Sequence, residues 1–181
     1  IAPGEYGTGN TFVNEVPGDV IPQEFVPYIE DSAKQACETG VLAGYPLTDV
    51  AIRLTGGKYD ERESTEMGFR NAAISALWDG AKAAKPALLE PVMAVEITVP
   101  AEFLGDVTGL LNSKRGRVTG MDQRRNDQIV HAEVPLIEMF GYATPLRSLT
   151  QGRGVFSMQL ARYEKVPEKL AAEITRLYAG A

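Results

Sequence analysis

Five cationic side chains lie close together near the middle of the chain, in the run GLLNSKRGRVTGMDQRRNDQIV at positions 109–130. These residues are Lys114, Arg115, Arg117, Arg124 and Arg125. Ammonium and guanidinium groups donate charge-assisted hydrogen bonds to phosphate oxygens, so the run predicts contact with a nucleic-acid backbone. Arg147 and Arg153, which flank the sequence SLTQG, extend the pattern. The dipole of a helix C-terminus would also favour Lys114 and Arg115, but it does not account for Arg124 and Arg125.

Catalytic chemistry is harder to find in this sequence. His131, the single histidine, lies in an alternating apolar segment without a serine or cysteine motif beside it. Cys37, the single cysteine, falls within a helical pattern and has no partner for a disulfide. The adjacent acids Asp60 and Glu61 are of the type that binds cations, but charged loops are usually solvated. The glycines of LTGGKY and TQGRG match neither a phosphate loop nor a dinucleotide motif. We therefore predict no catalytic residue, no bound cofactor and no metal site in this chain.

The first half of the sequence contains two helical patterns and one strand pattern. A helix is expected from about Pro27 to Gly40, after an irregular turn, because proline removes a hydrogen bond. Apolar residues alternate over 50–54 as in a half-buried strand, and a hairpin-like loop is expected at the following Gly56–Gly57 pair. A second helix is predicted with Ser64 as its N-cap. Its expected buried face consists of Met67, Ile74, Leu77 and Ala81.

The second half predicts the element order βαββαβ. Strands are expected at 93–100, 117–121, 128–134 and 154–163, with a polar turn at 122–127 and with Phe156, Met158 and Leu160 alternating in the last strand. Helices are expected at 101–116, with Phe103, Val107, Leu110 and Leu111 inward, at 135–152, and in a closing segment at 167–178. This split pattern, with two helices on one face of an antiparallel sheet, is typical of the ferredoxin-like fold.

Charge is unevenly distributed along the 181 residues, whose formal net charge is −6. Residues 1–90 carry 7 lysines and arginines against 14 acids, whereas residues 91–181 carry 11 against 10. This difference favours two small domains with different electrostatic roles. A single cysteine and the absence of long apolar runs favour a reducing compartment and no membrane span. Because the sequence begins without methionine, we expect it to be part of a longer chain.

A family resemblance is carried by four runs: FVNEVPGDVIPQEFVPYIEDSAKQACETGVLAGYPLTDV, LLEPVMAVEITVP, GDVTGLLNSKRGRVTGMDQR and VPLIEMFGYATPLRSLTQGRGVFSM. Together they closely resemble the C-terminal part of translation elongation factor G. The resemblance implies an α+β fold with two domains. Residues 1–89 resemble domain IV, with a ribosomal-protein-S5-like α/β fold truncated at its N-terminus, and residues 90–181 resemble domain V, which is ferredoxin-like.

The resemblance also implies partners. In this family, domain IV reaches the decoding region of the small ribosomal subunit, with its tRNA and mRNA, and domain V approaches the stalk base and rRNA of the large subunit. The seven cations named above would then dock on rRNA. The implied role is that of the ribosome-docking part of a translational GTPase that promotes translocation, as a monomer, in the cytoplasm or an organellar matrix and away from membranes. GTP and Mg²⁺ would belong to a parent domain upstream of this sequence.

One loop departs from the family pattern. A tip loop of domain IV usually reads Gly, a small residue, Tyr and His, but here it reads Gly57, Lys58, Tyr59 and Asp60, followed by Glu61. A carboxylate near phosphate is repelled, which predicts slow translocation that Asp60→His would accelerate. Alternatively, Asp60 points aside and Lys58 or Arg62 makes the contact.

Other roles stay open beside translocation. The altered tip loop is compatible with a ribosome-recycling or ribosomal-protection relative of the factor, whereas the run GYATPLRSLTQGRG favours the elongation-factor branch. A free-standing RNA-binding module is a further alternative. The missing initiator methionine and the net negative charge oppose that alternative.

Overall fold

The computed structural model describes residues 1–178, which form two compact units. The first unit consists of Ile1–Leu88 together with the segment from Pro167 onward, and the second consists of Leu89–Val166. Each unit has its own sheet and its own hydrophobic core. In the part of the chain that is described, no helix has both the length and the apolar run that crossing a bilayer requires.

The first unit has a three-stranded sheet in the order β1-β3-β2. Its strands are β1 (Ala2–Pro3), β2 (Thr11–Asn14) and β3 (Val50–Leu54), and β3 pairs in parallel with β2 and antiparallel with β1. The expected hairpin after β3 is therefore wrong, because both neighbours of β3 precede it in the chain. The loop after Leu54 leads instead into a helix.

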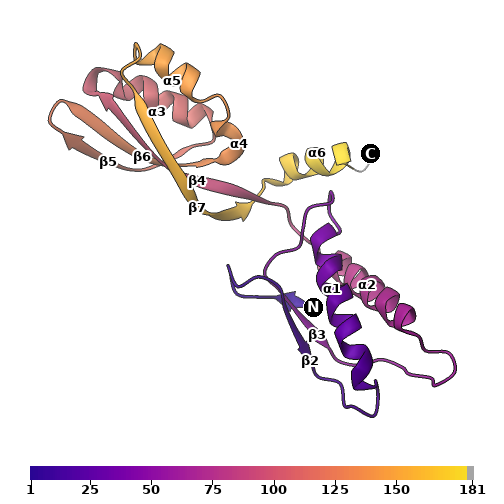
Figure 1. Cartoon of the computed structure of the whole chain (residues 1–181). Helices are drawn as coiled ribbons and strands as arrows, with labels where there is room; N and C mark the ends of the chain where they lie inside the picture. Colours follow the sequence, from indigo (N-terminus) through magenta and orange to yellow (C-terminus); the bar gives the residue numbers. More distant parts are fainter. Residues whose placement is uncertain (179–181) are drawn as a thin grey trace. The chain divides into compact units, whose positions relative to one another are not determined.

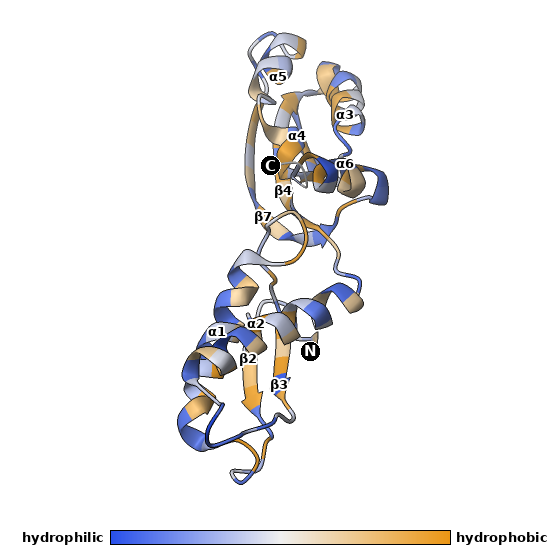
Figure 2. Cartoon of the chain, turned by 90° about the vertical axis from the view of Figure 1, so that its right-hand side faces the viewer, coloured by the Kyte–Doolittle hydropathy of each residue, from blue (hydrophilic) through white to orange (hydrophobic). Residues whose placement is uncertain are grey.

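Two helices, α1 (Val26–Thr39) and α2 (Glu66–Ala83), pack beside each other in this unit (Figure 1). A single 3₁₀ turn, η1 (Gln23–Phe25), precedes α1, which confirms the expected irregular start before the Pro27 position. Figure 2 shows β2 and β3 as largely hydrophobic and the two helices as mixed, as expected for helices that cover one side of a small sheet. Their shared core includes Ala33, Ala36, Cys37, Ile52 and Leu77.

Two details of α2 differ from the sequence prediction. Its N-cap is Thr65 rather than Ser64, and the Thr65 hydroxyl accepts a hydrogen bond from the backbone N–H of Gly68 at 3.1 Å. Met67, expected in the core, is 63% exposed. The hydroxyl of Ser64 is used elsewhere, because it accepts a hydrogen bond from the backbone N–H of Asp60.

The second unit confirms the βαββαβ order. Its elements are β4 (Leu89–Pro100), η2 (Ala101–Phe103), α3 (Leu104–Ser113), β5 (Arg117–Arg124), β6 (Asp127–Pro135), α4 (Leu136–Met139), α5 (Ala143–Leu149) and β7 (Val155–Lys165). The sheet order is β5-β6-β4-β7, and every neighbouring pair is antiparallel. Inward residues of β4 and β6 pack with α3 and α5 in one core, so both helices lie on one face of the sheet (Figure 1).

Three predictions for this unit need correction. Strand β5 continues to Arg124, so the turn shrinks from 122–127 to two residues, Arg125 and Asn126. The single helix expected at 135–152 is two short helices, α4 and α5, interrupted around Gly141 with φ +75°. In β7 only Phe156 packs against the core, whereas Met158 and Leu160 are 43% and 53% exposed. β7 lies at the edge of the sheet, and the helices α4 and α5 are short. They therefore cover only part of the apolar face of β7.

The closing helix α6 (Glu168–Tyr178) forms as predicted from its amphipathic pattern. It belongs by its contacts to the first unit, where the ring of Tyr178 lies 5.8 Å from the ring of Tyr45 in an edge-on arrangement.

Candidate nucleic-acid interface

The seven cations predicted to dock on rRNA occupy two opposite ends of the sheet in the second unit. Strand register sets this division, because Arg117 at the start of β5 lies opposite Glu133, whereas Arg124 at its end lies opposite Asp127. An eight-residue strand separates these ends by roughly 20 Å. One end holds Lys114, Arg115 and Arg117, and the other holds Arg124 and Arg125 together with the loop that follows α5.

At the first end, two cations pair with carboxylates. The guanidinium of Arg115 donates two hydrogen bonds to the Glu90 carboxylate, at 3.1 and 2.5 Å. That contact raises the pKa of Arg115. The ammonium of Lys114 lies 3.7 Å from a carboxylate oxygen of Glu138. Both cations are therefore occupied within the unit.

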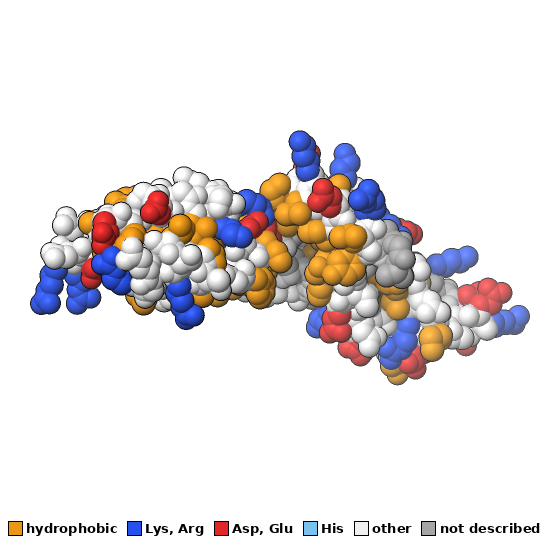
Figure 3. Space-filling view, turned by 90° about the horizontal axis from the view of Figure 1, so that it is seen from above, with side chains coloured by type: hydrophobic (Ala, Val, Ile, Leu, Met, Phe, Trp, Pro, Cys, Tyr) orange, Lys and Arg blue, Asp and Glu red, His pale blue; other side chains and the backbone are white. Residues whose placement is uncertain are grey.

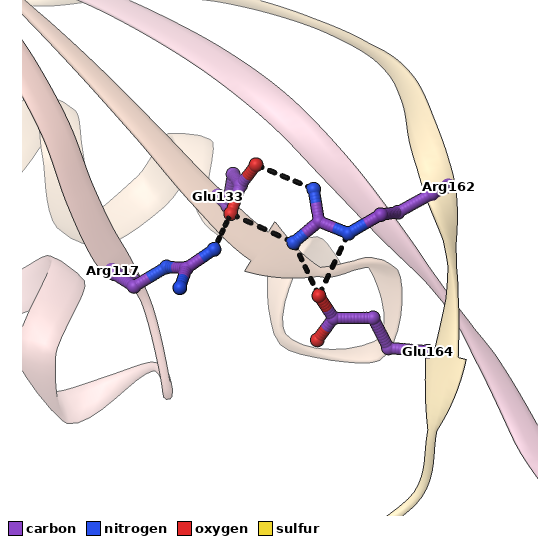
Figure 4. Close-up of polar contacts among 4 residues, drawn as sticks. All are labelled: Arg117, Glu133, Arg162 and Glu164. Atoms are coloured by element: carbon purple, nitrogen blue, oxygen red, sulfur yellow. Dashed lines mark hydrogen bonds and ion pairs between the residues drawn. The ribbon is translucent and has the colours of Figure 1, made fainter.

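Arg117 belongs to a larger network centred on Glu133 (Figure 4). Arg162 on β7 donates to both oxygens of Glu133 on β6, at 2.5 and 2.9 Å, and also donates through Nε to Glu164 at 2.8 Å. Arg117 on β5 donates to the same Glu133 carboxylate. The bonds from Arg162 and then from Arg117 lower the pKa of Glu133 from 4.5 to about 2. These contacts tie both edge strands to β6.

At the opposite end Arg124 lies across from Asp127 in the strand register, but no ion pair joins the two among the described residues. Arg124 and Arg125 are exposed, and neither makes an ion pair or a side-chain hydrogen bond within the described residues. Arg125 has φ +57°, a left-handed conformation that glycine adopts at lower energy than arginine. Arg125 forms part of the two-residue turn between β5 and β6, where its carbonyl accepts from the Gln123 side chain at 3.3 Å and its side chain stays exposed.

Arg147 and Arg153 lie at the same end, where α5 ends and β7 begins. The turn between them is tight: the hydroxyl of buried Thr150 accepts from the Gly154 N–H at 2.8 Å, and the Arg147 carbonyl accepts from the Gly152 N–H at 2.8 Å. Arg153 bonds to Glu102 at 2.7 Å and lies 4.7 Å above the Phe103 ring. Arg147 is exposed and unpaired within the described residues. In Figure 3, Lys and Arg side chains project at the extremity of this unit.

The tip loop of the first unit, residues 57–64, is held at several points. An added Cβ on Gly57 would lie 2.5 Å from Cδ1 of buried Ile21, so only glycine fits there without a shift. The Tyr59 ring lies 5.9 Å from the ring of Phe25. One carboxylate oxygen of Asp60 accepts from the backbone N–H groups of Arg62 and Glu63, at 2.9 and 3.2 Å. Lys58 and Glu61 are exposed.

The remaining titratable candidates do not come together in a reactive group. Nε2 of His131 lies 2.9 Å from Asp122 on the open face of the sheet, and its Nδ1 lies 3.9 Å from Glu96. Cys37 is fully buried, and burial raises the pKa of its thiol. Among the described residues, no three His, Cys, Asp or Glu side chains are grouped as metal ligands.

Sequence reasoning missed the acids that pair with three of the five cations in the run at 114–125. Glu90, Glu133 and Glu138 come from three different elements, and each is distant in sequence from the arginine or lysine that it binds. Arg162 was missed as well. The alternation of β6 could have indicated that His131 and Glu133 share the solvent face, because Val130, Ala132 and Val134 are the inward set.

Comparison with known proteins matches two family models to consecutive parts of the chain. Residues 1–85 match the model described as elongation factor G, domain IV, and residues 87–174 match the model described as elongation factor G C-terminus. A crystal structure of a protein from Thermus thermophilus is 35% identical and superposes with a TM-score of 0.86. The match covers 99% of this chain but 27% of that one, so this chain spans about a quarter of the similar protein.

Proposed function

Because the chain belongs to the elongation factor G family, through its domain IV and its C-terminal domain, we propose that it is the ribosome-docking part of a translational GTPase. The finer proposal is that the parent promotes movement of tRNA and mRNA during protein synthesis. We assign residues 1–89 to domain IV and 90–181 to domain V, and we place GTP and Mg²⁺ in another part of the parent protein. The parent would act as a monomer in the cytoplasm or an organellar matrix.

The observation that best supports docking is the end of the second unit with unpaired arginines. Arg124, Arg125 and Arg147 are exposed and have no acid partner among the described residues, in a chain whose net charge is −6. Guanidinium groups presented in this way suit the phosphates of rRNA. The acidic remainder of the protein would limit unspecific binding to other nucleic acids.

Sedimentation of the 181-residue chain with purified ribosomes, over a series of salt concentrations, tests this proposal. Binding should weaken linearly with the logarithm of salt concentration, because each phosphate contact releases counterions. Full-length elongation factor G should compete for the same site. Absence of salt-dependent binding, or binding without competition, would contradict the proposal.

A recycling or ribosomal-protection parent is the second candidate, and the observation in its favour is Asp60 at the tip position where the family usually has histidine. Single-turnover mRNA movement and subunit splitting, measured with the full-length parent, distinguish the two. A translocase accelerates the first reaction, whereas a recycling factor accelerates only the second.

A further inference from the structure

The carboxylate of Asp60 is engaged by the tip loop itself. Its Oδ1 accepts from the backbone N–H groups of Arg62, at 2.9 Å, and Glu63, at 3.2 Å. Two hydrogen bonds at one oxygen direct the charge of this carboxylate toward its own backbone. Asp60 is itself exposed, so these two bonds fix the orientation of the carboxylate without removing it from solvent.

Ser64 closes the same turn from the other side. Its hydroxyl accepts from the Asp60 backbone N–H at 2.9 Å, and its own N–H donates to the Asp60 carbonyl at 2.9 Å. The segment 61–63 is thus bracketed by reciprocal bonds between Asp60 and Ser64. Such a bracket fixes the backbone of a loop that has no regular secondary structure.

Aromatic packing anchors the loop on its N-terminal side. The Tyr59 ring lies 5.9 Å from Phe25, and the Phe25 ring lies 4.7 Å from Phe69 of α2. Phe25 and Phe69 both pack against the cluster of Val16, Ile21 and Ile29. These contacts anchor the tip, and its exposed charged side chains are Lys58, Asp60, Glu61, Arg62 and Glu63.

We infer that Asp60 is a positioning residue that shapes the tip loop so that Lys58 and Arg62 contact RNA phosphate. This inference rests on the proposed ribosome-docking function. Lys58 and Arg62 have no acid partner among the described residues, and a guanidinium with free N–H groups binds phosphate in a bidentate manner. Of the two hypotheses that the sequence left open, the geometry favours the one in which these cations make the contact.

Histidine cannot replace Asp60 in this role. A neutral imidazole has one acceptor nitrogen within a ring, and a protonated imidazole has none, whereas the Asp60 carboxylate oxygen serves two N–H groups. Asparagine keeps a carbonyl oxygen at the same place without the charge. Three variants therefore separate the hydrogen-bonding role of Asp60 from the effect of its charge: Asp60→Asn, Asp60→Ala and Asp60→His.

The first measurement is amide hydrogen exchange at Arg62 and Glu63 in the isolated chain. Asp60→Ala and Asp60→His should accelerate exchange at both amides by about tenfold, since hydrogen bonds to a charged acceptor are lost. Asp60→Asn should change it by no more than about threefold. Equal exchange in all four proteins would overturn the positioning role without bearing on ribosome binding.

The second measurement is binding to purified small ribosomal subunits over a salt series. Arg62→Ala should weaken binding by about threefold to tenfold and lower the salt slope by about 1, as for one phosphate contact. Lys82→Ala, which removes an exposed cation in the last turn of α2, is the matched control and should leave both quantities unchanged. The Arg62→Ala loss should shrink to less than about twofold in an Asp60→Ala background.

The outcomes separate this inference from the proposed function. If no variant and no control binds ribosomal subunits, the docking function fails. If the chain binds but Arg62→Ala behaves like Lys82→Ala, the inference fails and docking stands. If Glu61→Gln or Glu63→Gln weakens binding while Arg62→Ala does not, the loop binds a basic protein surface and the inference is wrong. If Asp60→Asn, Asp60→Ala and Asp60→His all bind more tightly than the wild type, the Asp60 charge simply repels RNA, and the positioning role is wrong.

Discussion

The two ends of the sheet in the second unit carry the same kinds of side chain and use them differently. At one end, Lys114, Arg115 and Arg117 each face a glutamate. At the other, Arg124, Arg125 and Arg147 form no ion pair among the described residues. The first end uses charge to join strands and helices, and the second leaves it available to a ligand.

This contrast shows that a cationic run is not by itself a binding site. The run at 114–125 reads as one feature in sequence, but strand β5 carries its two halves to opposite ends. The acids at the paired end screen their arginines from an approaching phosphate. A proposal for rRNA docking is therefore better restricted to Arg124, Arg125, Arg147 and the partly engaged Arg153.

The largest effect is expected from charge reversal at the unpaired end. Arg124→Glu combined with Arg125→Glu should weaken ribosome binding by about 10- to 100-fold at physiological salt and lower the salt slope by about 2. The free energy of unfolding should fall by no more than about 1 kcal/mol, since neither arginine makes an ion pair among the described residues but Arg124→Glu places a carboxylate opposite Asp127. Sedimentation and urea denaturation measure the two quantities. The control is Lys82→Glu with Lys85→Glu, which changes the same charge on the first unit and should not affect binding.

Removing Glu133, the central acid at the end with Lys114, Arg115 and Arg117, should lower stability and leave ribosome binding nearly unchanged. Glu133→Gln is expected to lower the free energy of unfolding by about 1–2 kcal/mol, because Arg162 and Arg117 lose a charged acceptor and solvent offsets only part of that loss. Ribosome binding should stay within about twofold. Urea denaturation at pH 7 gives the first value. A binding defect as large as that of the arginine reversal would break the distinction between the ends.

Acid should abolish the stability that Glu133 provides. Its pKa is lowered from 4.5 to about 2, so its contribution is complete above pH 4.5 and disappears as pH falls toward 2. The stability difference between wild type and Glu133→Gln should therefore shrink across that interval. Denaturation of both proteins at intervals between pH 6 and 2 checks this, and a constant difference would contradict the prediction.

A smaller loss is expected from the neighbouring ion pair. Arg115→Ala should destabilise the unit by about 1 kcal/mol, because it leaves Glu90, whose side chain is 12% exposed, without its two hydrogen bonds. Lys114→Ala serves as the comparison and should lose less, since its contact with Glu138 is long, at 3.7 Å. Thermal denaturation ranks the two, and the reverse order would be inconsistent with the geometry.

The smallest effect should have the opposite sign. Arg125→Gly removes a side chain from a left-handed backbone position and is expected to stabilise the unit by about 0.5 kcal/mol, after the greater freedom of glycine in the unfolded chain is allowed for. It should also weaken ribosome binding severalfold. A gain in stability with a loss of binding would sharpen the contrast between the ends, whereas a loss of stability would show that Arg125 supports the fold.

Local periodicity alone was sufficient to predict most elements. The βαββαβ order, α1 with its irregular start, α6, and the inward positions of Phe103, Val107 and Leu111 all follow from residue spacing. The tip loop also contains a local hydrogen bond, between Asp60 and Ser64, which lie only four positions apart in the sequence. The one-residue error in the N-cap of α2 arose because Ser64 and Thr65 compete for that position and Ser64 is already engaged by Asp60.

The sequence by itself thus determined which segments fold, which family the chain resembles and where the cations lie along the chain. Only the tertiary structure decided which of those cations remain available. Glu90, Glu133 and Glu138 meet their partners through strand pairing and helix packing across 16 to 29 residues of sequence. Ion pairs of this kind depend on distances of a few ångströms between elements that no local pattern specifies. Tertiary packing also decided that Met158 and Leu160, on the edge strand β7, are exposed, although their alternation is that of a buried strand face.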